Sequence, residues 1–400
     1  MILLLAALGC RAPIDPSSWA PARAAPGLDR PVEVRYRPGV PDDADGDWLV
    51  VQVPRGQWDR GLASAAANLL SQATDRRAAL DPASTASAAA AAGFPGQARF
   101  ARALTGGARP DGLLRDLRSA LPERAAVDLG MAVRRYGDGT ALWIVGIAPH
   151  LLDMDPIPRD LALDEALALR VDAAEGSRGD PVLYLAPPDG PVETLSLTSG
   201  VSRWVDRFSS GGEYRLGVAL ERGAILDVAL VFSVFVDGAS PSPVRLFPPS
   251  DAPADPVAAE GWLYGELNAL RAQHGLKPVS RFPLMEPVAR EHSALMASAG
   301  RVAHVLPGLT EGVAERAADE LHPRAEHHEA VAAAASAQDA MALIRGSPAH
   351  LRQVLCEACT GAAIGVALEP TLEHVPRLFF TLELLRFPNG VPAPIDHYNR

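Results

Sequence analysis

The spacing of apolar and polar residues changes twice along this chain and divides it into three parts. In residues 45–150, leucines at helical spacing in "PDGLLRDLRSALPER" precede "VDLGMAVRRYGDGTALWIVGIAP", which predicts a β-hairpin around Gly137-Asp138-Gly139. Residues 158–237 carry short runs of strand-forming residues separated by turn residues, which predicts an immunoglobulin-like β-sandwich. From residue 257 the helical spacing returns, and a second predicted hairpin closes the segment near residue 388. The pattern predicts an α/β protein with an all-β domain between two mixed ones.

The last part also contains a histidine at a predicted helix start. The stretch "RGSPAHLRQVL" combines Ser347, a good N-cap, with Pro348, which suits the first helical position, and this places His350 in the first turn. Backbone N–H dipoles at a helix start disfavour positive charge, so we expect His350 to be neutral. A neutral imidazole is suited to act as a ligand or as a base.

The two predicted hairpins resemble each other. Gly130 in "DLGMAV" aligns with Gly365 in "AIGVAL", and "ALWIVGIA" aligns with "LFFTLELL". This similarity indicates an internal repeat, in which residues 45–150 are a degenerate copy of the last domain; the alternative is that two hairpins merely look alike. Eight of the ten histidines lie between residues 274 and 374, and none precedes His150. A histidine-based site is therefore expected only in the last domain.

Composition and charge restrict the class of protein. A chain of 400 residues with 48% hydrophobic and 21% charged residues is typical of a folded protein with two or three domains. The net charge of −11, with no dense basic stripe, argues against a nucleic-acid partner. Two proline-rich stretches, within 11–44 and at 238–256, are predicted to be a tether and an interdomain linker. No later apolar run reaches the roughly 18 residues of a membrane span.

The chain begins with "MILLLAALGC", an apolar run that ends in a cysteine. Residues 1–10 resemble a bacterial lipoprotein signal peptide, in which Cys10 is lipidated and attaches the mature protein to a membrane; the alternative is a buried N-terminal strand. Cys356 and Cys359 remain, in "CEAC", and in an exported protein one pair most simply forms a disulfide. A redox motif or a zinc site is less favoured, because there is no second pair.

Several catalytic motifs are absent. The sequence contains no H-E-x-x-H, no G-x-S-x-G elbow and no glycine-rich phosphate loop. The stretch closest to H-E-x-x-H, "HPRAEHHE" at residues 322–329, has the wrong spacing for two ligands on one helical face. Its polar cluster could bind a metal opportunistically, but a solvated polar segment that enters a helix is favoured; the cluster consists of His322, Glu326, His327, His328 and Glu329.

The segment from about 258 to 388 resembles the superfamily of cysteine-rich secretory proteins, antigen 5 and pathogenesis-related-1 proteins (CAP), in its bacterial form. "LNALRAQHGLKPV" resembles the family's opening helix and its exit, and "VAREHSALMASAGRVAH" its second helix. "RGSPAHLRQVL" resembles the family's "N-S-P-G-H-R-x-N-I-L", and "IGVAL" and "LFFTLEL" resemble its closing strands. The matched residues are Asn268, Arg271, Gly275, Leu276, Pro278, His304, Glu320 and His350.

This resemblance implies an α-β-α sandwich at 257–388 in which His304, Glu320 and His350 converge on one cleft. The sequence departs from the family at Asp319, Leu321 and Gln353, which indicates a remodelled site. A second glutamate of the cleft is not assigned, because strand alternation allows Glu383 to point inward or outward.

Three functions remain open at this point. The first is a secreted or lipid-anchored bacterial envelope protein that uses the cleft to bind a small molecule, lipid, peptide or glycan. The second is a metal-dependent hydrolase, because His304, Glu320 and His350 are a ligand set that suits catalytic zinc with an open fourth position. The third is a structural envelope protein with a vestigial site.

Overall fold

The computed structural model describes most of the chain beyond residue 32. The described residues are 33–73, 80, 82–106, 108–119, 126–197, 202–222, 225–238, 255–306, 326–369 and 378–387. The predicted signal peptide with Cys10, most of the predicted linker at 238–256 and Glu320 lie outside these ranges. The protein is of mixed α/β class, with eight helices among the described residues. None of these helices is long and apolar enough to cross a membrane.

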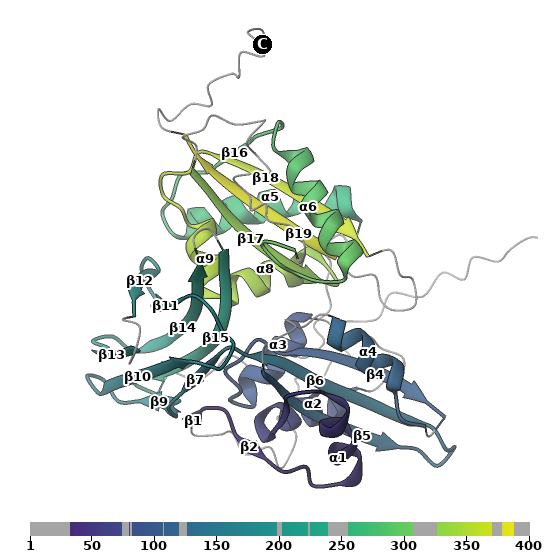
Figure 1. Ribbon diagram of the computed structural model, residues 1–400. Coiled ribbons are helices and arrows are strands. Elements are labelled where there is room, and N and C mark those ends of the chain that lie inside the picture. Colours follow the sequence, from purple (N-terminus) through teal and green to yellow (C-terminus); the bar gives the residue numbers. More distant parts are fainter. Residues whose placement is uncertain are drawn as a thin grey trace, which may run out of the picture.

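The N-terminal domain is a five-stranded sheet covered by helices (Figure 1). The strand order is β2 (Pro38–Gly39), β3 (Gly56–Asp59), β5 (Ala126–Arg135), β6 (Ala141–His150) and β4 (Arg99–Thr105). Its helices are α1 (Ala44–Gln52), α2 (Arg60–Gln72), α3 (Pro82–Ala91) and α4 (Asp111–Ser119). β5 and β6 form the hairpin predicted around Gly137-Asp138-Gly139, and the positive φ of 80° at Gly139 explains the glycine there.

The middle domain consists of two sheets that enclose a common apolar core. One sheet contains β13 (Ser202–Arg207), β10 (Ala166–Ala173) and β7 (Leu152–Met154). The other contains β12 (Glu193–Ser196), β11 (Asp180–Ala186), β14 (Gly212–Arg222), β15 (Ile225–Val236) and β9 (Asp160–Leu161). In β10 burial alternates residue by residue, as a strand with one core face requires.

Part of the predicted tether belongs to the folded structure. β1 (Glu33–Val34) pairs with β8 (Ile157–Pro158), and Val34 is only 2% exposed. The proline-rich composition suggested that the tether continues to residue 44, but the apolar side chain of Val34 is buried in the core of the middle domain. The described structure therefore includes residues before the predicted domain boundary at residue 45.

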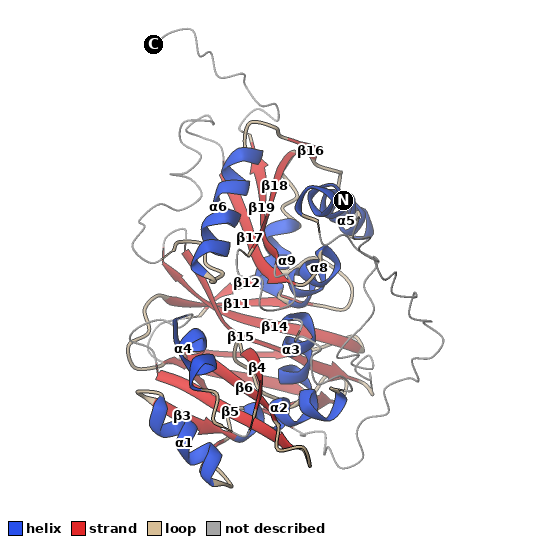
Figure 2. Cartoon of the chain, turned by 90° about the vertical axis from the view of Figure 1, so that its right-hand side faces the viewer, coloured by secondary structure: helices blue, strands red, loops and turns tan. Residues whose placement is uncertain are grey.

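The C-terminal domain has three layers (Figure 2). Its sheet has the order β16 (Ser280–Arg281), β18 (Gly361–Leu368), β19 (Leu378–Arg386) and β17 (Glu326–Ala334). α6 (Glu286–Ala299) covers one face, whereas α5 (Pro256–Gln273), α8 (Ala337–Gly346) and α9 (Pro348–Val354) cover the other. This arrangement has the α-β-α layers that the resemblance implied for residues 257–388.

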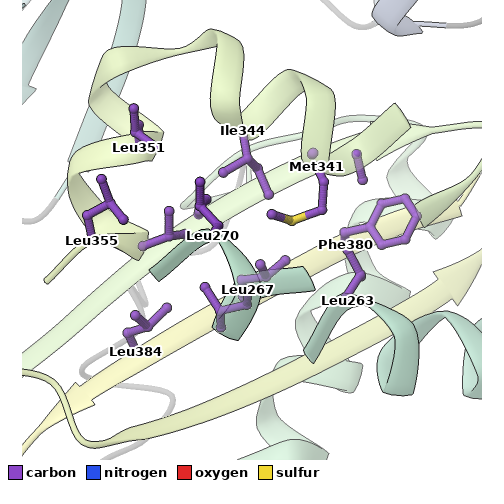
Figure 3. Close-up of a cluster of buried hydrophobic side chains, with 14 of the residues drawn as sticks. Leu263, Leu267, Leu270, Met341, Ile344, Leu351, Leu355, Phe380 and Leu384 are labelled. Carbon is purple, nitrogen blue, oxygen red and sulfur yellow. The ribbon is translucent and has the colours of Figure 1, made fainter. Parts of the chain in front are cut away.

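The main core of this domain lies between the sheet and α5, α8 and α9 (Figure 3). Leu263, Leu267 and Leu270 form the apolar stripe of α5, and each is at most 4% exposed. They lie in one cluster with Met341, Ile344, Leu351, Phe380 and Leu384. Because burying a leucine side chain stabilises a fold by about 2 kcal/mol, this stripe fixes α5 on the sheet.

The two mixed domains share one order of paired strands. β3 pairs with β5 in parallel, and β5–β6 and β6–β4 are antiparallel. β16, β18, β19 and β17 repeat this pattern in the same order. A helix also crosses each hairpin over a glycine, α2 over Gly130 and α6 over Gly365. The shared topology favours the degenerate-copy hypothesis, which stays a prediction.

The C-terminal domain packs on one face of the five-stranded sheet of the sandwich. α9 contacts β11 and β14, and Pro348 lies so close to Gly217 that a Cβ at that glycine would be 3.3 Å from its ring. The Arg215 guanidinium donates a hydrogen bond to the carbonyl of Arg345. Tyr184 of β11 belongs to the main core of the C-terminal domain. The two domains therefore share buried apolar surface.

Candidate functional site

β17 presents polar side chains to two different environments. The segment was predicted to be a solvated stretch entering a helix, but residues 326–334 form an edge strand paired with β19. Along this strand Val331 and Ala333 pack beside α6, whereas Ala330 and Ala332 join the core beneath α5 and α8. Side chains alternate between the faces of a strand, so Glu329 faces the α6 side and His328 the other. The helical prediction was wrong because the polar half of the strand hides its period of two.

Glu329 forms the centre of a buried polar cluster on the α6 side. Its Oε1 lies 2.7 Å from Nδ1 of His304, and its Oε2 lies 3.9 Å from Nε2 of His292. The His292 ring is 2% exposed, and its Nε2–H donates to the carbonyl of Ala303 at 3.0 Å. Since the Glu329 carboxylate can only accept, Nδ1 of His304 carries the proton in this pair. A singly protonated His304 ring with this hydrogen bond has its lone pair on Nε2.

A second carboxyl group lies next to Glu329 on the same face. Glu383 of β19 is directly opposite Glu329 in the antiparallel pairing, and its side chain is fully buried. Its strand neighbour Thr381 contacts the Ser293 hydroxyl of α6 at 2.8 Å, which shows that these positions of β19 face α6. The alternation that the sequence left open is therefore resolved, and Glu383 points inward.

His350 completes the cluster from α9. Its ring centroid lies 6.2 Å from that of His304, with 30° between the ring planes. Burial, followed by the nearby His304, lowers the pKa of His350 to about 3, against the opposing effect of Glu329. The expected neutral state is thus reached, but burial is the main cause rather than the helix start. Ser347 is the N-cap of α9 but makes no side-chain capping hydrogen bond.

The structure brings together two of the three predicted site residues, and the Glu329 carboxylate lies beside them. His304 and His350 lie side by side, while Glu320 falls outside the described residues. The sequence placed Glu329 in the polar cluster at 322–329, where a solvated segment was favoured, and it assigned neither Glu329 nor His292 to the cleft of His304 and His350. The sequence did contain a signal for this strand: the six residues after Glu329, "AVAAAA", are all small or apolar, which fits a buried strand.

This arrangement is compatible with a divalent metal. Two imidazoles on one zinc ion have ring centroids roughly 5 Å apart, given Zn–N distances near 2 Å. The 6.2 Å separation of His304 and His350 is within reach of a small side-chain rotation. Glu329 would then orient His304 through Nδ1, as carboxylates commonly do for zinc-bound histidines.

The remaining cysteines lie on the other side of the sheet. Cys356 and Cys359 are joined by a disulfide, and they are 4% and 3% exposed. Arg271, a residue of the motif at 268–278, holds this loop: its guanidinium donates to the carbonyls of Val354 and Cys356 at 2.9 and 3.0 Å. Asn268 of the same motif donates through Nδ2 to the carbonyl of Val279 and accepts through Oδ1 from the N–H of Val279. These two matched residues thus have structural roles.

No protein-family model matches the sequence, and a comparison with curated proteins finds no match. An outer surface protein from Borrelia burgdorferi is 18% identical, with 32% of this chain and 92% of that chain covered and a TM-score of 0.28. An extracellular protein containing an SCP domain from Bacillus anthracis is 12% identical, and the match has a TM-score of 0.28 and covers 55% of this chain and 82% of that chain. A cysteine-rich secretory protein from Staphylococcus aureus is 10% identical, and the match has a TM-score of 0.25 and covers 59% of this chain and 85% of that chain. At TM-scores this low, these likenesses carry no argument about function.

Proposed function

We propose that this protein is an extracytoplasmic, CAP-like envelope protein that binds a lipid, peptide or glycan at the His304–Glu329–His350 cluster. The observation that carries the proposal is the polar cluster itself: two histidines and a carboxylate lie together beside the edge strand β17. Buried polar groups are costly, and they persist where they are hydrogen-bonded or serve a ligand.

The electrostatics of the cluster suit recognition of a polar group. His350 stays neutral at physiological pH, because its pKa is lowered to about 3, and so it can accept a hydrogen bond or coordinate an ion. His304 is held by Glu329 in a fixed tautomer. Such a preorganised pair loses little conformational freedom when a ligand binds.

The predicted lipid anchor would place this site at the cell envelope. Lipidation of Cys10 is tested by metabolic labelling with a radioactive fatty acid, with a Cys10→Ser variant as the control. Label in the parent chain that is absent from the variant supports the anchor, and an unlabelled parent chain contradicts it.

Binding is tested with the full chain and two envelope probes: insoluble peptidoglycan, and vesicles of phosphatidylglycerol and phosphatidylethanolamine. Glu329→Gln and the double variant His304→Ala/His350→Ala are expected to lose at least tenfold in affinity for one probe. Glu291→Gln is the matched control, since it makes the same change on the exposed side of α6. Equal binding by all variants, or none by the parent chain, would contradict the proposal and favour a structural protein with a vestigial site.

A metal-dependent hydrolase is the second candidate. The Nδ1 contact of His304 with Glu329 favours it, since this is the arrangement that orients a zinc-bound histidine. Zinc would be held by His304 and His350 and would supply a polarised water as nucleophile. One zinc equivalent in calorimetry that disappears in the double variant, together with hydrolysis of a peptide substrate, would select this function over plain binding.

A further inference from the structure

A second group of potential ligands lies on the opposite side of the sheet from the His304 cluster. Nitrogen of His328 and the sulfurs of Cys356 and Cys359 all lie within 4.8 Å of one another. His328 comes from the edge strand β17, and the two cysteines come from the turn after α9. Three side chains from two distant segments therefore meet at one point.

These residues border a cleft between two domains. The cleft has a volume of about 610 Å³, and His328 and Cys356 contribute to its wall. Residues 190–192 of the sandwich line it together with His274 and Glu357 of the C-terminal domain. Both cysteines are nearly buried, and Cys356 lines the cleft.

The orientation of His328 is suited to a metal. Its Nδ1 lies 2.9 Å from Oε1 of Gln353, and an amide oxygen can only accept a hydrogen bond, so Nδ1 carries the proton. The neutral ring then has its lone pair on Nε2. Metal-binding histidines typically have this second contact, which fixes the tautomer and the ring plane. Gln353 is one of the positions where the sequence departs from the CAP pattern.

The loop that carries the cysteines is held in place by a buried arginine. Arg271 is fully buried, and its described hydrogen bonds all end on backbone carbonyls, among them those of Cys356 and Cys359. These hydrogen bonds hold the backbone on either side of the two cysteines in place. The Cα atoms of the two cysteines are 5.4 Å apart, and they need not move for the sulfurs to separate to roughly 3.8 Å, the spacing of two thiolates on one zinc ion.

We propose that reduction of the Cys356–Cys359 disulfide creates a zinc site formed by both thiolates and His328, with a fourth position open to the interdomain cleft. A thiol reductant supplies the electrons. Two of its thiols form one disulfide, and the two electrons and two protons that they give up break the Cys356–Cys359 bond and convert both cysteines to thiols. Zinc binding then releases those two protons. The site is a redox-controlled metal site, separate from the His304 cluster.

Cobalt(II) is the probe, because its thiolate complexes absorb strongly in the near ultraviolet. The full chain is used in a Cys10→Ser, His304→Ala/His350→Ala background, so that Cys356 and Cys359 are the only cysteines and the His304 cluster cannot contribute. After anaerobic reduction we expect one cobalt equivalent with a thiolate charge-transfer band, displaced by zinc. The oxidised chain is expected to show no such band.

Two variants with a matched control complete the test. His328→Ala is expected to weaken cobalt binding at least tenfold, and Gln353→Ala by roughly 10- to 100-fold through loss of the ring contact. His327→Ala, the same change on the other face of β17, is expected to leave binding unchanged. The proposal is overturned if the reduced chain shows no thiolate band, if His327→Ala and His328→Ala weaken binding equally, or if circular dichroism shows that reduction unfolds the chain.

Discussion

Replacing Gly365 by alanine is expected to force α6 away from the sheet. Gly365 lies in β18 beneath this helix, and a Cβ built on it would be 2.2 Å from the carbonyl carbon of Ala289 and from the amide nitrogen of Arg290. These are backbone atoms, so no side-chain rotation relieves the clash. Ordinary contact begins at 3.4 Å, so the helix must retreat by about 1 Å.

The cost follows from what the helix carries. α6 holds Ala289, His292 and Met296 in buried positions, and a retreat of the helix loosens all of them. Overpacking of this kind costs about 3 kcal/mol. Alanine in a strand recovers up to about 1 kcal/mol by restricting the unfolded chain. We therefore expect Gly365→Ala to lower the free energy of unfolding of the C-terminal domain by about 2 kcal/mol.

The assay is hydrogen exchange of the intact chain, monitored by mass spectrometry of peptides from each domain, because it reports the stability of one domain among three. Gly261→Ala is the matched control: it lies in α5, nothing is within 4 Å of its added Cβ, and alanine is the better helix former by about 1 kcal/mol. We expect the two substitutions to have opposite signs. Equal protection in Gly365→Ala and the parent chain would refute the close approach of α6 and β18.

Two histidines are expected to give opposite pH dependences of stability. Burial alone lowers the pKa of His150, but hydrogen bonds and charges of Asp128 and Asp153 outweigh it and raise the pKa to about 9. Protonated His150 therefore stabilises the fold by roughly 3 kcal/mol below pH 6.5, and this stabilisation is lost as the pH rises through 9. Urea unfolding from pH 6 to 10 should show this loss, and His150→Gln should remove the pH dependence. For His350 the pKa of about 3 means that the unfolded state binds the proton first, so stability falls as the pH drops from 6.5 toward 3. Exchange protection of the C-terminal domain should show this fall, and a His350→Gln variant with the same fall would contradict the assignment.

Much of the local structure could be predicted from the sequence. The leucine stripe of α5 has a period that only a helix satisfies, and the structure buries all three leucines. The Gly137-Asp138-Gly139 turn also predicted its hairpin, since a tight turn between strands requires glycine. These features depend on residues close together in the chain.

The candidate site could be predicted only in part. The resemblance paired His304 with His350, whereas the carboxylate that it assigned, Glu320, lies outside the described residues, and Glu329 was not assigned to this cleft. β17 was missed because its first half is polar on both faces: His328 faces Gln353 and Glu329 faces His304. Such a strand lacks the apolar alternation by which half-buried strands are recognised.

The sequence by itself determined the periods of the helices and strands, the turn glycines and the charge that argues against nucleic acid. Only the tertiary structure decided which polar groups meet. His304 and Glu329 are 25 residues apart, and His150 is 22 residues from Asp128. Sequence periodicity reports which face of an element is buried, whereas partners across a sheet depend on strand order and register. The chemistry of this protein therefore lies in contacts between segments that no local pattern connects.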